Sequence, residues 1–293
     1  MMKLINIAAM SFLAFTATQT YALDAGKSIY SHGAENYMVG VIPPSGFAGL
    51  IYGMHYSSDR LNDSNGDRIN IPNFKVEATG IVPRFVWVSD SKILGGNFIL
   101  DSLVPLVHLK ATAGNENVSE SGIGDIMIGT ALGYHHSPNL HSALALDFYL
   151  PTGDYDQNKI VNIGTNRLTI EPAYAVTYIN DKFNADIRVG YLYNGENHDT
   201  NYESGDEFHF DYALGLNHKN LTYGVSGYYQ KQIQNDRSNG VELLNSKTEG
   251  FSIGPSFKYQ YQNWFITAKY EKEIMSKNKT EGDSFWIKTV LPF

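Results

Sequence analysis

The chain has 293 residues, a net charge of −8 and no cysteine, and it is rich in Tyr (20) and Phe (15). The acidic balance excludes a nucleic-acid-binding function, which needs a basic face against the phosphates. The lack of cysteine excludes a disulfide framework, so hydrogen bonds and packing must hold the fold together. The length suits one large β domain.

Residues 1–22 have the pattern of a secretory signal peptide. Lys3 precedes an apolar stretch from Leu4 to Ala14, and Thr20-Tyr21-Ala22 forms a small-x-small cleavage pattern. The apolar stretch is too short to cross a bilayer as a helix. We therefore expect residues 1–22 to be removed on export, which indicates a protein destined for the cell envelope.

Residues 23–47 precede the first clear strand and include Tyr30, Tyr37 and Phe47. The segment is too aromatic for a free periplasmic tail. Two hypotheses stay open for it. It folds into the mouth of a barrel made by residues 48–293 and fills the lumen, or it forms an ordered periplasmic collar or an additional strand.

From residue 48 onward, apolar and polar residues alternate in stretches separated by turn-forming residues. Alternation with a period of two is typical of β-strands that have one apolar face. We predict twelve strands, at 48–57, 76–88, 95–110, 122–135, 140–150, 166–179, 183–194, 207–217, 221–232, 248–260, 264–274 and 283–293.

The connections between these strands alternate in length. Tight turns follow the even-numbered strands, and long polar connections follow the odd-numbered ones, at 58–75, 111–121, 151–165, 195–206, 233–247 and 275–282. Short turns on one side of the membrane and long loops on the other are typical of outer-membrane barrels. We therefore predict an all-β fold: a transmembrane antiparallel up-and-down β-barrel of about 12 strands, with short periplasmic turns, longer extracellular loops and both termini periplasmic.

The alternation also predicts which side chains face the lumen. In strand 207–217, Phe208 and Phe210 lie on the face opposite to His209 and Asp211. A charge at the bilayer midplane costs about 2–4 kcal/mol for Arg or Lys, so the polar faces must line the lumen. The signs of these charges are mixed, which disfavours a pore selective for one ion sign. We predict that the solute path is lined by Arg84, Asp147, Tyr149, Arg167, Glu171, Asp186, Arg188, His209, Asp211, Lys258, Lys269, Trp286 and Lys288.

Three strands depart from the regular pattern. Strand 95–110 is apolar on both faces except for two polar residues, so we expect it to pack against something inside the barrel. Pro172 and Pro255 lie in mid-strand, where proline cannot donate to the hydrogen-bond ladder. One hypothesis is a lateral opening at these prolines through which an apolar solute leaves toward lipid. The alternative is that they form bulges that only set the curvature.

Several motifs resemble a known family of outer-membrane transporters. The resemblance spans residues 36–293 and rests on Asp147-Phe148-Tyr149-Leu150-Pro151-Thr152-Gly153-Asp154, Glu171-Pro172, Ser204-Gly205-Asp206-Glu207-Phe208-His209-Phe210-Asp211, Ile253-Gly254-Pro255 and Gly282-Asp283-Ser284-Phe285-Trp286. The family is named for the meta-pathway of phenol degradation and includes the sphingosine-induced porin group. The resemblance implies a channel for small hydrophobic or amphiphilic compounds, and it transfers no catalytic or binding residues.

An outer-membrane hydrolase and a general small-solute porin are the alternatives. A hydrolase needs a nucleophile near a base at the extracellular rim, and we find no such set of residues. His209 and Asp211 share one lumenal face, but two residues make an incomplete metal site. A weak divalent-ion site in the polar connection 58–75 stays open. We predict no catalytic residues, no cofactor and no metal.

The sequence thus predicts a bacterial outer-membrane channel for passive uptake of small, largely apolar compounds, such as aromatics or lipid-derived molecules. Its expected partners are these solutes, outer-membrane lipid and lipopolysaccharide, and the barrel assembly machinery. The last strand ends on an aromatic residue, Phe293, which resembles the signature that this machinery recognises.

Overall fold

The computed structural model describes residues 27–262 and 264–291. The predicted signal peptide, residues 1–22, and the terminal Phe293 lie outside the described residues. No helix within the described part is long and apolar enough to cross a membrane.

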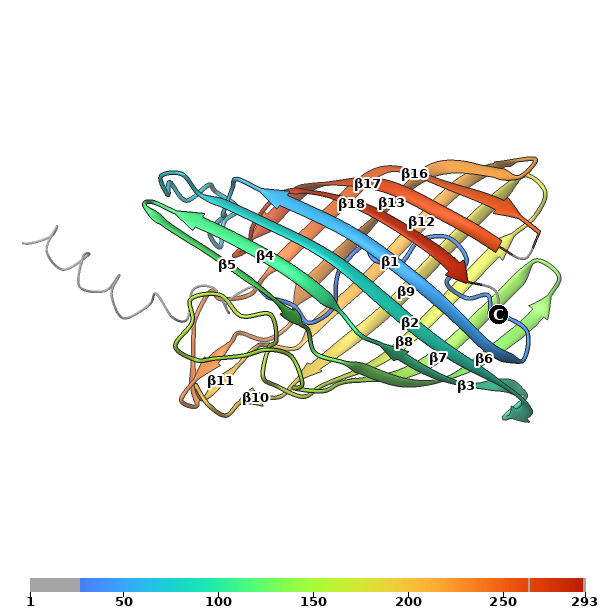
Figure 1. Ribbon diagram of the computed structural model, residues 1–293, viewed down its shortest axis with the longest axis horizontal. Coiled ribbons are helices and arrows are strands. Elements are labelled where there is room, and N and C mark those ends of the chain that lie inside the picture. Colours follow the sequence, from blue (N-terminus) through green and yellow to red (C-terminus); the bar gives the residue numbers. More distant parts are fainter. Residues whose placement is uncertain (1–26, 263, 292–293) are drawn as a thin grey trace, which may run out of the picture.

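The main sheet is a closed antiparallel barrel (Figure 1). Its strands are β1 (Gly46–Ser58), β2 (Lys75–Ile93), β3 (Gly96–Leu103), β4 (Leu106–Ala113), β5 (Glu116–Ile123), β6 (Met127–Ser137), β7 (Leu140–Tyr149), β8 (Thr169–Ile179), β9 (Phe183–Asn194), β12 (Glu207–His218), β13 (Leu221–Gln232), β16 (Glu249–Tyr261), β17 (Trp264–Lys277) and β18 (Asp283–Leu291). Strands that follow one another in this series pair with each other, except β3 with β4 and β5 with β6, and β1 pairs with β18.

The barrel closes where β1 pairs with both β2 and β18. Gly49 lies opposite Leu291 and Ser57 opposite Asp283, so the first and last strands align along most of their length. One part of β2 pairs with β3 and another part pairs with β4, so β3 and β4 together make one strand position of the wall. In the same way, β5 and β6 together make the next position. The prediction of a closed antiparallel barrel of twelve strands is confirmed.

The predicted loop at 111–121 is instead a β-hairpin. Strands β4 and β5 pair from Leu106↔Ile123 to Ala113↔Glu116, with a turn at Gly114. The hairpin extends beyond the neighbouring strands at the loop end of the barrel (Figure 1). Beyond the lipid, a strand has no need of an apolar face, and β5 accordingly has the polar sequence ENVSESGI, which lacks the alternation that the prediction used.

Among the described residues, β5 pairs only with β4. Its other edge faces the connection 150–168. Among the described residues, the backbones of the two bond at the base of β5, where the Asp154 amide donates to Ile123 O at 2.9 Å, and the Lys159 side chain bonds Glu120. The barrel wall therefore lacks a continuous ladder at this place. Two other long connections, 195–206 and 233–248, form a small sheet at the loop end from β10 (Glu196–Asn197), β11 (Tyr202–Glu203), β14 (Arg237–Ser238) and β15 (Val241–Glu242).

The short turns meet the geometry that tight hairpins require. Between β2 and β3, Ile93 pairs with Gly96, which leaves a two-residue turn. Leu94 has a φ of 51° and Gly95 a φ of 83°. Positive φ at both central residues is the type I′ turn, whose twist matches that of the strands it joins.

The outer surface of the barrel is apolar, and the lumenal side is polar. Exposed apolar side chains project outward from every part of the wall, including those of Ile81, Phe85, Leu144, Tyr174, Ile187, Leu214, Val225, Phe257, Tyr270 and Ile287. Most of the buried charged side chains alternate with such residues along the strands. This division fits a barrel that stands in lipid, where closure leaves no unpaired sheet edge at membrane depth.

We predict that Leu214→Arg, at the centre of the outer face of β12, destabilises the barrel by about 2–4 kcal/mol. The cause is a charge placed against hydrocarbon. The matched control is Leu221→Arg, next to the turn, where the same charge reaches water and should cost no more than about 1 kcal/mol. Equilibrium unfolding in urea from lipid vesicles measures both, and equal effects would contradict the assignment of the outer face.

Candidate functional site

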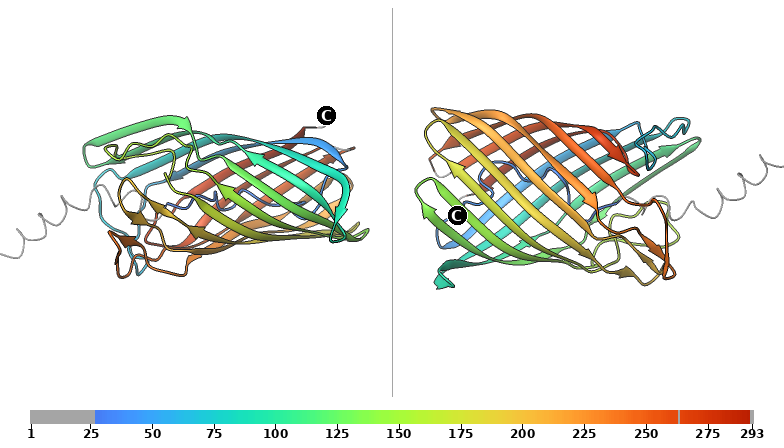
Figure 2. Two further views of the ribbon diagram at one scale, coloured as in Figure 1. Left: turned by 90° about the horizontal axis from the view of Figure 1, so that it is seen from below. Right: turned by 180° about the vertical axis from the view of Figure 1, so that it is seen from behind.

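Residues 27–45 run through the inside of the barrel. Figure 2 shows this segment within the ring of strands in both views. It passes from the loop end at Lys27 to the turn end, where β1 begins at Gly46 beside Val88. The first described residue therefore lies at the loop end and not at the periplasmic end. We call residues 27–45 the lumenal segment.

The loop end of the lumenal segment is fastened to the connection between β7 and β8. The Lys27 ammonium donates to the carbonyl oxygens of Asn162, Ile163 and Gly164 at 2.8, 3.0 and 3.0 Å. The Arg167 guanidinium donates to Lys27 O at 3.2 Å. The segment and this connection are thus coupled by four hydrogen bonds.

Asp211 is the principal acceptor for the middle of the segment. Its carboxylate accepts from the Tyr30 hydroxyl at 2.8 Å and from the amides of Gly33 and Glu35 at 3.0 Å each. The Asp211 side chain is 2% exposed. Hydrogen bonds to a buried carboxylate contribute about 1.5–3 kcal/mol each, so this residue fixes the course of the segment.

Asp186 performs the same task nearer to the turn end. It accepts from the amides of Met38 at 2.8 Å and Val39 at 3.2 Å. One residue further along the segment, the Gly40 amide donates to the Thr177 hydroxyl at 2.8 Å. A side chain at Gly40 would clash, because an added Cβ would lie 2.7 Å from the Thr177 nitrogen. The backbone amides of the segment, which would otherwise lack hydrogen-bond acceptors inside the lumen, thus donate to side chains of the barrel wall.

Glu35 is the acidic residue that the segment itself supplies. It lies 2.8 Å from the Arg84 guanidinium and 3.1 Å from the Lys288 ammonium, and it accepts from the Tyr52 hydroxyl at 2.9 Å. The Lys269 ammonium donates to the carbonyl oxygens of Gly33 and Glu35. Three cations of the wall therefore converge on the segment. The Glu35 carboxylate pairs with two of them, and the carbonyl oxygens of the segment accept hydrogen bonds from the third.

A second group of charges joins neighbouring strands of the wall. Arg188 bridges Glu171 at 2.5 Å and Asp147 at 3.1 Å. Glu171 also accepts from the Tyr149 hydroxyl at 2.8 Å and lies 3.0 Å from His209 Nε2. This network touches the segment through ring contacts, because Arg188 lies over the Tyr30 ring and His209 is 4.2 Å from it, centre to centre.

The structure brings the predicted solute-path residues together around the segment. Lys258 lies 5.9 Å from the centre of the Tyr37 ring, and the Lys269 ammonium lies 5.8 Å from the Trp286 ring. The remaining predicted residues are those described above. Arg167 precedes β8 and lies in the connection, whereas the others face inward, as the alternation along their strands predicted, and most bond to the segment or to each other. Their role in a solute path stays a prediction.

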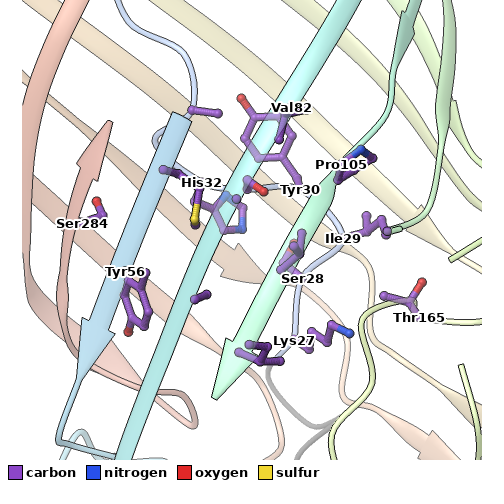
Figure 3. A pocket seen from close by; sticks show the side chains of 18 of the residues that line it. Lys27, Ser28, Ile29, Tyr30, His32, Tyr56, Val82, Pro105, Thr165 and Ser284 are labelled. Atoms are coloured by element: carbon purple, nitrogen blue, oxygen red, sulfur yellow. The ribbon is translucent and has the colours of Figure 1, made fainter. Parts of the chain in front are cut away.

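A separate, largely apolar cavity of about 470 Å³ lies between the lumenal segment and the strands β2 and β4. Figure 3 looks into it, with Ile29, Tyr30 and His32 of the segment on its lining. Apolar side chains of β2, β4 and the β7–β8 connection form its walls: Val76, Ala78, Val82, Val107, Leu109, Ala111, Ile160, Val161 and Ile163. Charged side chains also line it: Lys27, Glu35, Arg84, Asp125, Asp147, Arg188, Glu273 and Lys279.

These apolar lining residues were not predicted. One feature of the sequence points to them: the predicted strand at 95–110 is apolar on both faces. In the structure its outer face, for example Leu106, is exposed, while its inner face lines the cavity through Val107 and Leu109. Nearer to the turn end, Ile99 on β3 packs with Val86, Val88 and Ile42 of the segment.

One ion pair joins the connection above the cavity to the β4–β5 hairpin. The Lys159 ammonium donates to Glu120 Oε2 at 2.9 Å. This hydrogen bond to the Glu120 carboxylate raises the pKa of Lys159 above its usual value.

In the connection 59–74, Asp63 Oδ1 accepts from the amides of Asn65 and Asp67, so an Asx turn accounts for the polar sequence there.

The closed sheet, the apolar exterior and the lumenal charges define a transmembrane β-barrel of the bacterial outer-membrane type. The chain belongs to the family described as MetA-pathway of phenol degradation, whose model matches residues 58–289. No curated protein matches the sequence.

A solved outer-membrane channel has the same fold. An outer-membrane channel from Pseudomonas putida F1 superposes with a TM-score of 0.77 at 14% sequence identity, over 87% of this chain and 98% of that one. A deletion mutant of the monoaromatic hydrocarbon channel TodX matches with a TM-score of 0.44 at 10% identity, over 89% of this chain and 92% of that one.

We predict that Asp211→Ala loosens the lumenal segment without unfolding the barrel. Hydrogen exchange of the Gly33 and Glu35 amides should accelerate about 10-fold or more, because each loses a carboxylate acceptor. The control is Thr222→Ala, which removes a buried hydroxyl that bonds Asn217 and not the segment. Unchanged exchange at Gly33 and Glu35 in the Asp211 variant would contradict the role assigned to this carboxylate.

Proposed function

We propose that the protein is an outer-membrane channel for passive uptake of small hydrophobic or amphiphilic compounds, such as aromatics or lipid-derived molecules. The observation that carries the proposal is the apolar cavity between β2, β4 and the lumenal segment, about 470 Å³ in volume. A cavity of this size and lining suits a small apolar molecule. Membership of a family described by phenol degradation supports the same class of solute.

The interior also argues against a general porin. The lumenal segment occupies the barrel, and its contacts bring cations and anions together in pairs, as Arg84 and Glu35 do at 2.8 Å. Twelve strands enclose a narrower interior than the 16–18 of general porins. An apolar solute would therefore leave water against the apolar side of the cavity, whose charged lining residues include the paired Arg84, Asp147 and Arg188.

A catalytic barrel is the remaining alternative. We propose that the protein is not an enzyme, and turnover of ester or peptide substrates by the purified barrel would favour the alternative.

We also propose that the exposed apolar belt contacts outer-membrane lipid and lipopolysaccharide. Phe293, which lies outside the described residues, is proposed as the contact for the barrel assembly machinery, and its replacement by Ala should lower the amount of folded protein in the outer membrane.

Flux measurements on the refolded protein in liposomes and planar bilayers test the proposal. We expect saturable flux of simple aromatics with little ionic current, and slow flux of sugars. Leu109→Asp should reduce aromatic flux about 10-fold or more, because an unpaired carboxylate in the cavity wall disfavours an apolar occupant.

The matched control is Leu109→Met, which conserves volume and apolarity and should retain the flux. Large, unselective ionic current through the unaltered protein would identify a general porin instead. Equal aromatic flux in both Leu109 variants would exclude the cavity as part of the path.

The route from the cavity to lipid is a further part of the proposal. The ladder between β8 and β9 skips from Ile170 to Ala173 around Pro172. The ladder between β16 and β17 skips from Ile253 to Ser256 around Pro255. The register is the same on both sides of each gap. We keep these two prolines as candidate lateral openings.

If apolar solutes leave at these prolines, Pro172→Ala and Pro255→Ala should slow aromatic flux several-fold, since the restored amide closes the ladder. Pro138→Ala, in a short turn, is the control. Flux that stays at the level of the unaltered protein would assign the prolines to curvature alone.

A further inference from the structure

Two histidines and a carboxylate meet between the lumenal segment and the wall. His209 and Asp211 lie on the inner face of β12, and His32 comes from the segment. One ligand atom from each of the three lies within 4.8 Å of the others. His209 is fully buried, and the side chain of His32 is 8% exposed. The third candidate ligand, His32, thus comes from the segment, and the sequence alone did not show that it lies beside the other two.

Each imidazole is held by a buried glutamate. His32 Nε2 lies 2.8 Å from Glu207 Oε1, and His209 Nε2 lies 3.0 Å from Glu171 Oε1. Within the described part of the chain, Nδ1 of both rings and Nε2 of His32 are buried and make no hydrogen bond, so Glu207 faces His32 as an ion-pair partner. A carboxylate on one ring nitrogen, with the other nitrogen free, is the arrangement that orients metal-binding histidines and raises their basicity.

The local charge favours a cation. Glu171 is paired with Arg188, whereas Glu207 and Asp211 have no Lys or Arg partner within 4.0 Å among residues 27–262 and 264–291. The three hydrogen bonds that Asp211 accepts and the contact of Glu207 with His32 stabilise these carboxylates in part, and their burial without a cation still costs free energy. A divalent ion between the two imidazoles and Asp211 would supply that compensation.

We propose that His32, His209 and Asp211 form a binding site for a divalent transition-metal ion of the Zn²⁺ type, which clamps the lumenal segment to the barrel wall. Two nitrogens and one carboxylate oxygen suit Zn²⁺ and disfavour Mg²⁺ and Ca²⁺. Bonds of about 2.0–2.2 Å place such ligands roughly 3–4 Å apart, so side-chain movements of about 1 Å would complete the site. His32 also lines the cavity. The proposal is independent of the transported solute.

A second histidine pair must be removed before this site is measured. His135 Nδ1 and His141 Nδ1 lie 2.7 Å apart on the exposed turn end of β6 and β7. This pair would itself bind transition metals. The double substitution His135→Asn and His141→Asn gives a background in which the lumenal cluster can be studied, and the absence of cysteine removes thiolate ligands.

The test is titration of the untagged, refolded full-length protein with Co²⁺, followed by its visible absorption, and competition by Zn²⁺. In the His135/His141 background we expect one bound ion per chain. His32→Asn should weaken Zn²⁺ binding about 100-fold or more, and Glu207→Gln about 10–100-fold through loss of the supporting carboxylate. His32 belongs to the segment and to no strand, so its substitution leaves the barrel ladder intact, as heat-modifiable electrophoretic mobility will verify.

Two results would overturn the proposal. One is the absence of binding tighter than about 1 mM in the His135/His141 background. The other is binding that persists unchanged in the His32→Asn variant, which would place the ion elsewhere. Both are obtained without any solute, so they are separate from a failure of the channel function.

Discussion

Lipid offers no hydrogen-bond partner to a polar group, and the architecture follows from that constraint. The sheet closes between β1 and β18, and the charged side chains of its strands turn inward. Inside, these charges must be neutralised in turn, because burial without a partner is costly. The lumenal segment meets this need: its amides bond Asp211 and Asp186, and its carbonyls accept from Lys269. The segment and the wall thus supply the hydrogen-bond partners that each needs inside the barrel.

The interior is divided between a polar and an apolar sector. Strands β9, β12, β17 and β18, together with Arg84 on β2, carry the charges that hold the segment. Apart from Arg84, the residues of β2 and β4 that line the cavity are mostly apolar. An apolar molecule therefore has an apolar wall against which to leave water. Ions meet the filled sector instead. The division explains how one barrel can favour apolar solutes over hydrated ones.

Much of the fold could be predicted because its signals are local. The period of two in each strand and the alternation of short turns with long loops depend only on neighbouring residues, and both held in the structure except at 111–121, where the hairpin stands clear of lipid. The same alternation predicted that Arg188 and Asp211 face inward.

The pairings inside the barrel could not be predicted, since they join residues far apart in sequence. The lumenal segment has no periodicity, so neither its course nor the approach of His32 to His209 leaves a trace in the sequence. The apolar cavity left one trace, the strand that is apolar on both faces. Its other wall, at Ile160 to Ile163, comes from a connection without regular structure.

The central claim is that the lumenal segment fills the path that ions would take. The most direct test is the single-channel conductance of the refolded barrel after deletion of residues 27–42, compared with the full chain in the same bilayer. We expect the conductance to be about 10-fold or more above that of the full chain, because the deletion opens an aqueous lumen lined by paired charges. A conductance unchanged by the deletion would show that the lumenal segment does not block ions.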